Sequence, residues 1–151
     1  MRIMGLDVGE KTIGIAVSDE LGIGANPLTV VSRTGSVKRE IAEVCRIAEE
    51  YKVGRIVVGM PLMLNGTAGI QAVKATVFAE ALQRRSKIPV IMWDERLSTA
   101  EVERMLIASD QSRAKRKKVI DKLAAAVILQ SYLDRQRSGA SEQGGSDGDQ
   151  G

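Results

Sequence analysis

The chain has 151 residues and a formal net charge of +3, with 44% hydrophobic and 27% charged residues. These values predict one globular domain large enough to bury its own core. The sequence has no histidine and one cysteine, Cys45, which excludes Ser-His-Asp and Cys-His catalysis, histidine-bearing or all-cysteine zinc sites, and an internal disulfide. No apolar run approaches a membrane span and residues 1–19 do not read as a signal peptide, so we expect a cytoplasmic protein without membrane contact.

The carboxyl end differs from the rest of the chain in composition. Residues 138–151 are rich in Gly and Ser and have no apolar periodicity, which predicts a disordered tail after a domain over residues 1–137. Three of the 19 acidic residues lie in this tail, so the domain carries 22 basic and 16 acidic residues, near +6. That charge favours a polyanionic partner.

The amino-terminal stretch GLDVGEKTIGIAVSD reads as a β-hairpin. Residues 2–8 and 12–18 are short β-rich runs, and residues 9–11 join them. On the first run, Asp7 shares a face with the small residue Gly5, and the second run alternates small residues with large ones. If these small residues share the Asp7 face, that face is shallow, and another backbone can come close to it. We expect the space to accommodate a phosphate backbone beside Asp7.

Further elements follow from apolar periodicity in the rest of the chain. In chain order we expect a strand over 27–32, a helix over 36–51, a strand over 55–60, a helix over 70–85, a strand over 89–95, a helix from Ser98 and a last helix over 119–136. The expected inward residues of the 70–85 helix are Ile70, Val73, Val77, Phe78, Ala81 and Leu82. Those of the last helix are Ile120, Leu123, Ala124, Val127 and Ile128.

This order of elements predicts an α/β fold. Three hairpin-linked strands followed by alternating helices and strands give a five-stranded mixed sheet, whose first three strands are antiparallel, with helices on both faces. The same order is found in the ribonuclease H-like fold.

Three carboxylates stand at positions that this fold can bring to one edge of the sheet. Asp7 ends the first strand, Glu95 ends the last strand with Asp94 as a weaker candidate beside it, and Asp121 opens the last helix. Taken singly, Asp7 can make an Asx-type turn, Glu95 can be a solvated strand end, and Asp121 can favour a helix dipole. Clustered carboxylates repel one another unless a cation lies among them. Mg²⁺ or Mn²⁺ suits such oxygen ligands and the hydrolysis of phosphodiester bonds.

Basic residues beside these acids are candidates for binding substrate phosphates. The run RAKRKK supplies five of them just before Asp121, and it reads equally well as a solvated charge run. Lys11 in the hairpin turn and Arg96 next to Glu95 also have plain structural alternatives. The complete set is Lys11, Arg96, Arg113, Lys115, Arg116, Lys117 and Lys118.

Four ordered blocks of the sequence resemble the YqgF/RuvX family, over nearly all of residues 1–134. They are GLDVGEKTIGIAVSD, GMPLMLNGTAGIQA, DERLSTAEVERML and KRKKVIDKLAAAVILQSYLD. The resemblance implies a ribonuclease H-like nuclease that processes the 5′ end of precursor 16S ribosomal RNA in ribosome biogenesis. It also implies metal-binding catalytic roles for Asp7, Glu95 and Asp121.

Three alternatives remain open at this point. The same site can resolve Holliday junctions in branched DNA, which favours a homodimer over a monomer. The D-x-G hairpin also resembles the phosphate loop of sugar and acetate kinases, although the chain has length for only one of their two domains. A non-catalytic RNA-binding factor for ribosome assembly fits the basic charge as well.

Overall fold

The structure is a computed structural model that describes residues 1–60, 68–94 and 113–143. The expected helix from Ser98 lies outside these residues. The described elements are, in chain order, β1 (Arg2–Val8), β2 (Thr12–Ser18), β3 (Ala25–Ser32), α1 (Val37–Glu50), β4 (Val53–Met60), α2 (Ala68–Ser86), β5 (Val90–Asp94) and α4 (Arg113–Gln143).

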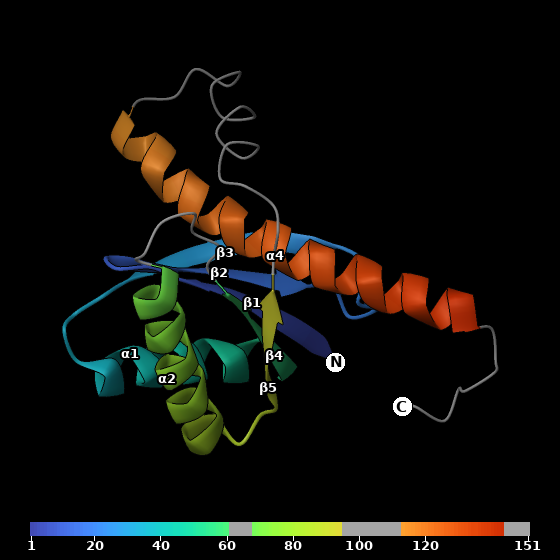
Figure 1. Cartoon of the computed structure of the whole chain (residues 1–151), viewed down its shortest axis with the longest axis horizontal. Helices are drawn as coiled ribbons and strands as arrows, with labels where there is room; N and C mark the ends of the chain where they lie inside the picture. The colour runs from blue at the N-terminus through green and yellow to red at the C-terminus, as the bar shows by residue number, and fades with distance from the viewer. Residues whose placement is uncertain (61–67, 95–112, 144–151) are drawn as a thin grey trace.

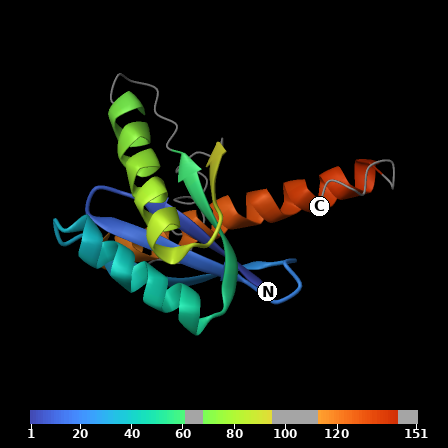
Figure 2. The same cartoon turned by 90° about the horizontal axis from the view of Figure 1, so that it is seen from below.

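The five strands form one mixed sheet in the order β3-β2-β1-β4-β5. β2 pairs antiparallel with β1 and β3, whereas β4 pairs parallel with β1, and β5 pairs parallel with β4. Figure 2 shows the arrows of β4 and β5 pointing the same way. The predicted sheet, with its first three strands antiparallel, is confirmed.

Side-chain alternation along β1 decides which helices cover each face of the sheet. Met4, Leu6 and Val8 are buried in one core cluster with apolar residues of α1 and α2. Ile3 points to the opposite face and packs against the cluster that contains α4. Helices therefore cover both faces, with α4 crossing one and α1 and α2 lying on the other (Figure 1).

The small residues of the hairpin lie on the α4 face, as the alternation predicts. The strand register pairs Gly5 with Ala16 and Asp7 with Gly14. Directly opposed residues of an antiparallel pair project from the same face of the sheet. Asp7, which is half-buried, therefore lies on the face that α4 crosses.

The predicted inward face of α2 is wrong at two positions. Val73 and Val77 are 61% and 54% exposed, whereas Phe78 and Leu82 are buried as expected. The buried residues at 75, 78, 79 and 82 follow the helical spacing i, i+3, i+4 and i+7. The sequence therefore contains two overlapping apolar stripes, one with the valines at 73 and 77 and one with the alanines at 75 and 79. The helix buries the stripe with the alanines.

The last helix is longer than the sequence suggested. It begins at Arg113 rather than at residue 119, so the basic run lies inside its first turns, which fits the high helix propensity of Ala, Arg and Lys. It continues to Gln143, past the start of the expected tail at Ser138, and the disorder of the remaining tail stays a prediction. Its buried side is centred on Ala125 and Leu129 rather than on Ala124 and Val127, which are half-buried.

Candidate active site at the sheet edge

The carboxyl ends of β1, β4 and β5 meet at one edge of the sheet because these three strands are parallel. β4 lies between the other two, as expected for this fold, so the backbones of β1 and β5 are roughly 10 Å apart. Asp7 is the next-to-last residue of β1, and Asp94 is the last residue of β5. The predicted ligand Glu95 directly follows Asp94 and lies outside the described residues, as does Arg96.

The helix α4 crosses β1 and β4 in very close contact, and glycines make this possible. A Cβ atom built on Gly5 would lie 2.7 Å from Cβ of Leu129 and 3.0 Å from the carbonyl oxygen of Ala125. On β4, a Cβ atom on Gly59 would lie 2.5 Å from Cδ1 of Ile128. Carbon atoms in contact normally keep about 3.5–4.0 Å. At Gly5 and Gly59 the space is thus taken by α4, and our expectation that the small residues beside Asp7 leave room for a phosphate backbone is wrong at Gly5.

Contacts along α4 show the direction in which it crosses the sheet. Near the start of β4, the Arg55 guanidinium donates from Nη1 to the hydroxyl of Tyr132 at 2.8 Å. Further along the same strand, Gly59 lies against Ile128, and at the middle of β1, Gly5 lies against Ala125. Moving toward the carboxyl end of the parallel strands therefore corresponds to moving back along α4. Asp121 lies one helical turn before Ala125 in this direction, and its side chain lies outside the described part of the chain.

The basic run occupies the amino-terminal turns of α4. It therefore lies beyond Asp121 in the direction that leads from Ala125 back along the helix. The helix backbone there is described, but the side chains are not. This holds for the predicted phosphate contacts Arg113, Lys115, Arg116, Lys117 and Lys118. Within residues 1–60, 68–94 and 113–143, the side chains that the structure describes contain no group of three acidic, histidine or cysteine residues able to hold a metal ion. Two of the three predicted ligands, Glu95 and Asp121, are not among those side chains.

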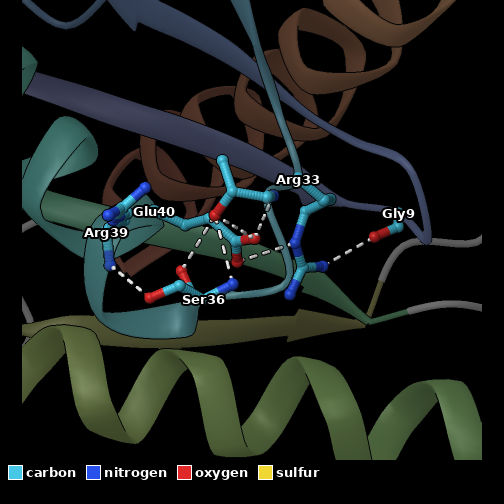
Figure 3. Close-up of polar contacts among 6 residues, drawn as sticks. Gly9, Arg33, Ser36, Arg39 and Glu40 are labelled. Carbon is cyan, nitrogen blue, oxygen red and sulfur yellow. Dashed lines mark hydrogen bonds and ion pairs between the residues drawn. The ribbon is translucent and has the colours of Figure 1, made fainter.

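A buried ion pair holds the turn that follows Asp7 (Figure 3). Nε of Arg33 donates to Oε1 of Glu40 at 2.9 Å, and Nη1 of the same guanidinium donates to the carbonyl oxygen of Gly9 at 2.7 Å. The Glu40 side chain is only 1% exposed, and its second oxygen accepts a hydrogen bond from the Thr34 amide at 2.7 Å. The amide of Arg33 also donates to the Lys11 carbonyl at 2.8 Å. The β1–β2 turn is therefore fixed to the end of β3 and to the start of α1.

Lys11 lies in this turn and is exposed, close in sequence to Asp7 as predicted. It lines a pocket of about 610 Å³ on the α1 and α2 side of the turn. Lys11 thus stands at the sheet edge but borders the face opposite to the one on which Asp7 lies.

Ser18 and Asp19, the last two residues of the hairpin motif, have structural roles that sequence reasoning did not assign. The Ser18 hydroxyl is buried and accepts a hydrogen bond from the Ile3 amide at 2.9 Å. The Asp19 carboxylate accepts from the amides of Ile23 and Gly24, both at 3.0 Å, and these bonds lower the pKa of Asp19. Ser18 therefore ties the end of β2 to the start of β1, whereas Asp19 stabilises the connection from β2 to β3.

A family model described as RuvX, Holliday junction resolvase, matches residues 1–135. A protein of Desulforamulus reducens, named as a candidate pre-16S rRNA nuclease, is 54% identical over 134 residues that cover 89% of this chain and 97% of that protein. A protein of Symbiobacterium thermophilum with the same name is 57% identical over 134 residues, covering 89% of this chain and 92% of that one.

Solved structures show the same fold at much lower identity. RuvC of T. thermophilus, in complex with a Holliday junction substrate, has a TM-score of 0.59 and 15% identity, covering 91% of this chain and 96% of that chain. The Fowlpox virus resolvase, in complex with Holliday junction DNA, has a TM-score of 0.50 and 14% identity, covering 90% and 99%. The family match and the two close relatives together show that this chain belongs to the RuvX family of nucleases, with a ribonuclease H-like fold.

Proposed function

We propose that this protein hydrolyses phosphodiester bonds in structured RNA, with the 5′ end of precursor 16S ribosomal RNA as its substrate, at a divalent-metal site formed by Asp7, Glu95 and Asp121. The curated relatives, which are above half identical to this chain, are named for the same substrate. Processing of ribosomal RNA would place the protein in the cytoplasm.

The observation that carries this proposal is the close packing of α4 on Gly5. This contact fixes Ala125 above the middle of β1. Asp121 is four residues, about 6 Å, before Ala125 along the helix, and Asp7 is two residues, about 7 Å, beyond Gly5 along the strand. The two displacements run in the same general direction, which supports a shared site for Asp7 and Asp121.

The chemistry of these residues fits a hard divalent cation. Carboxylate oxygens are preferred ligands of Mg²⁺ and Mn²⁺, and the sequence has no histidine to serve in their place. An ion bound there supplies activation of a water molecule and neutralisation of charge on the leaving oxygen. Glu95 follows a strand two positions away from β1, so we expect it to approach the site from the far side of β4.

The chain's own contribution is to hold the substrate backbone across the sheet edge. We propose that the basic run at the start of α4 contacts phosphates on one side, and that Lys11 and Arg96 contact them near the scissile bond. The five basic residues of the run lie within one helix, and such a dense group of positive charges suits the phosphate backbone of a nucleic acid. Each lost contact is expected to weaken binding to all sequences and to reduce its salt dependence.

Resolution of Holliday junctions is the second candidate function, because the matching family model is described by that activity. Cutting two symmetric strands requires two active sites, so this function calls for a homodimer, whereas a monomer suffices to cut RNA. Light scattering of the protein alone and with a four-way junction separates these states.

Cleavage assays with Mg²⁺ test the proposed function on two substrates, a precursor 16S 5′ leader RNA and a four-way DNA junction. We expect the RNA to be cut, and we expect Asp7→Asn and Asp121→Asn to lower the rate by at least about 100-fold, as for loss of a group that acts in the transition state. Asp134→Asn is the matched control on α4, since Asp134 is exposed and pairs only with nearby Gln130 and Arg137 among the described residues. Unchanged cleavage by both substituted proteins would refute the proposed site. Binding of RNA without cleavage by the wild-type protein would support the non-catalytic alternative.

A further inference from the structure

The pocket beside the β1–β2 turn has the composition of a ligand site, and of its lining residues the proposed function uses only Lys11. It lies between that turn, the start of α1 and one side of α2, and its volume is about 610 Å³. Pockets for small organic groups usually have about 300–1,000 Å³. Val8 is part of its wall and directly follows Asp7, so the pocket opens next to the candidate active site from the other face of the sheet.

Apolar side chains that face solvent are concentrated in this pocket. Val37, Val73 and Val77 are 40%, 61% and 54% exposed, and all three line it. Buried Phe78 lies behind them. Scattered exposed valines are ordinary, but a cavity that gathers them indicates a surface that a ligand covers.

The polar groups of the pocket favour an anion. Lys11 and Lys74 are exposed on its rim, and Glu10 is the acidic residue that partly offsets them. Arg33 also lines the pocket, but its charge is balanced by the ion pair with Glu40. Two lysines against one glutamate leave a net positive rim above an apolar wall.

The guanidinium of Arg33 is held rigidly in this wall. Its Nε and Nη1 atoms donate to Glu40 and to the Gly9 carbonyl, and its carbon Cζ lies 5.5 Å from the centre of the Phe78 ring. Among the described residues no hydrogen bond from its Nη2 atom is found, so that donor is available to a ligand. A fixed cation with an available N–H group adds a directional contact for a phosphate oxygen.

We propose that this pocket binds one unstacked nucleotide of the substrate strand, with the base against the valines and a phosphate near Lys11 and Lys74. The proposal rests on the proposed function, since it assumes a nucleic-acid strand at the neighbouring sheet edge. A nucleotide has an anionic phosphate for the positive rim of the pocket and a flat base for its apolar wall. In RNA, the bases of single-stranded segments are the ones that can be splayed out. The volume of the pocket suits one such unit.

Fluorescence anisotropy of a labelled single-stranded RNA hexanucleotide tests this pocket without any cleavage, in a buffer free of divalent ions. Two substitutions alter the pocket at exposed positions, Lys74→Glu on its rim and Val77→Asp on its wall. Two matched controls lie elsewhere on the surface, Arg84→Glu on the same helix and Leu21→Asp, a residue that is 81% exposed. Circular dichroism verifies that each variant is folded.

We expect Lys74→Glu and Val77→Asp to weaken hexanucleotide binding roughly tenfold and the two controls to change it less than about twofold. For an RNA duplex of matched length, we expect the affinities of the pocket variants and of the controls to differ much less than they do for the single strand. Equal binding by pocket and control variants would overturn the proposal. Because no cleavage is measured, a protein that binds in this manner but cuts no substrate would overturn the proposed function and leave the pocket assignment standing.

Discussion

Alanine at position 5 is expected to destabilise the protein, although a glycine-to-alanine change in a strand ordinarily does the opposite. Such a change gains about 0.4–1 kcal/mol through the unfolded state where the backbone tolerates it. Here the new Cβ would lie 2.7 Å from Cβ of Leu129 and 3.0 Å from the Ala125 carbonyl oxygen, so α4 must shift by up to about 1 Å to reach normal contact distances. Overpacking of this kind costs about 1–3 kcal/mol, which exceeds the gain. With the middle of each range, the net cost is about 1.3 kcal/mol, which lowers the melting temperature by roughly 3–5 °C.

Three further substitutions show whether the contact atoms are identified correctly. Leu129→Ala keeps the Cβ atom that Gly5→Ala would meet, so it is not expected to rescue Gly5→Ala. On β4, by contrast, the three atoms nearest to a Cβ on Gly59 all lie beyond Cβ in Ile128, and Ile128→Ala removes these three. The Gly59→Ala and Ile128→Ala changes are therefore expected to cost less together than the sum of their separate effects.

Urea unfolding followed by circular dichroism measures these free energies, with Gly24→Ala as the control. A Cβ on Gly24 would lie 3.6 Å from the Asp19 carboxylate, which is ordinary contact. If Gly5→Ala is as stable as the wild type, the close packing of α4 on β1 is refuted. If Leu129→Ala restores the stability of Gly5→Ala, the contact with Cβ of Leu129 is refuted.

Three further predictions concern contacts that stabilise the fold. Glu40→Gln leaves the partly buried Arg33 without its ionic partner and is expected to lower the free energy of unfolding by about 3 kcal/mol; a loss below about 1 kcal/mol in urea unfolding would contradict the role of the pair. Because the pKa of Asp19 is lowered in the folded state, its carboxylate contributes stability at pH values above its ordinary pKa of 3.8. That contribution is lost as the pH falls through the pKa of the folded state. The stability difference between wild type and Asp19→Asn is therefore expected to shrink as the pH falls from neutral to about 2, and a constant difference would refute it. Tyr132→Phe removes the hydroxyl that accepts from Arg55, and is expected to cost about 0.5–1.5 kcal/mol in the same assay, whereas no change would show that this contact does not hold α4 in place.

The architecture was predictable because alternation and periodicity report burial directly. The β1 pattern places Gly5 and Asp7 on one face and large apolar residues on the other, and the structure has this arrangement. The sequence could not predict what fills the space above the small residues, because a packed helix and a bound phosphate backbone both need small residues there. The structure assigns the space at Gly5 to α4.

The prediction was wrong where one sequence pattern fitted two arrangements equally well. On α2 the valines at 73 and 77 fit an apolar stripe as well as the alanines at 75 and 79 do, and only packing against the sheet selects the alanines. The pairing of Arg33 with Glu40 has no sequence signal, because both residues stand in an ordinary charged stretch, and their contact depends on how β3 leads into α1. The roles of Asp7, Glu95 and Asp121 remain predictions.

Calorimetric titration with Mn²⁺ in the absence of nucleic acid tests most directly whether Asp7 and Asp121, which are 114 positions apart in the chain, form one metal site. The wild-type protein, Asp7→Asn, Asp121→Asn and the surface control Asp134→Asn are compared under identical conditions. We expect the wild type and the control to bind the ion alike, and each of the other two substitutions to weaken binding at least about tenfold. Equal Mn²⁺ affinity in all four proteins would contradict a shared site.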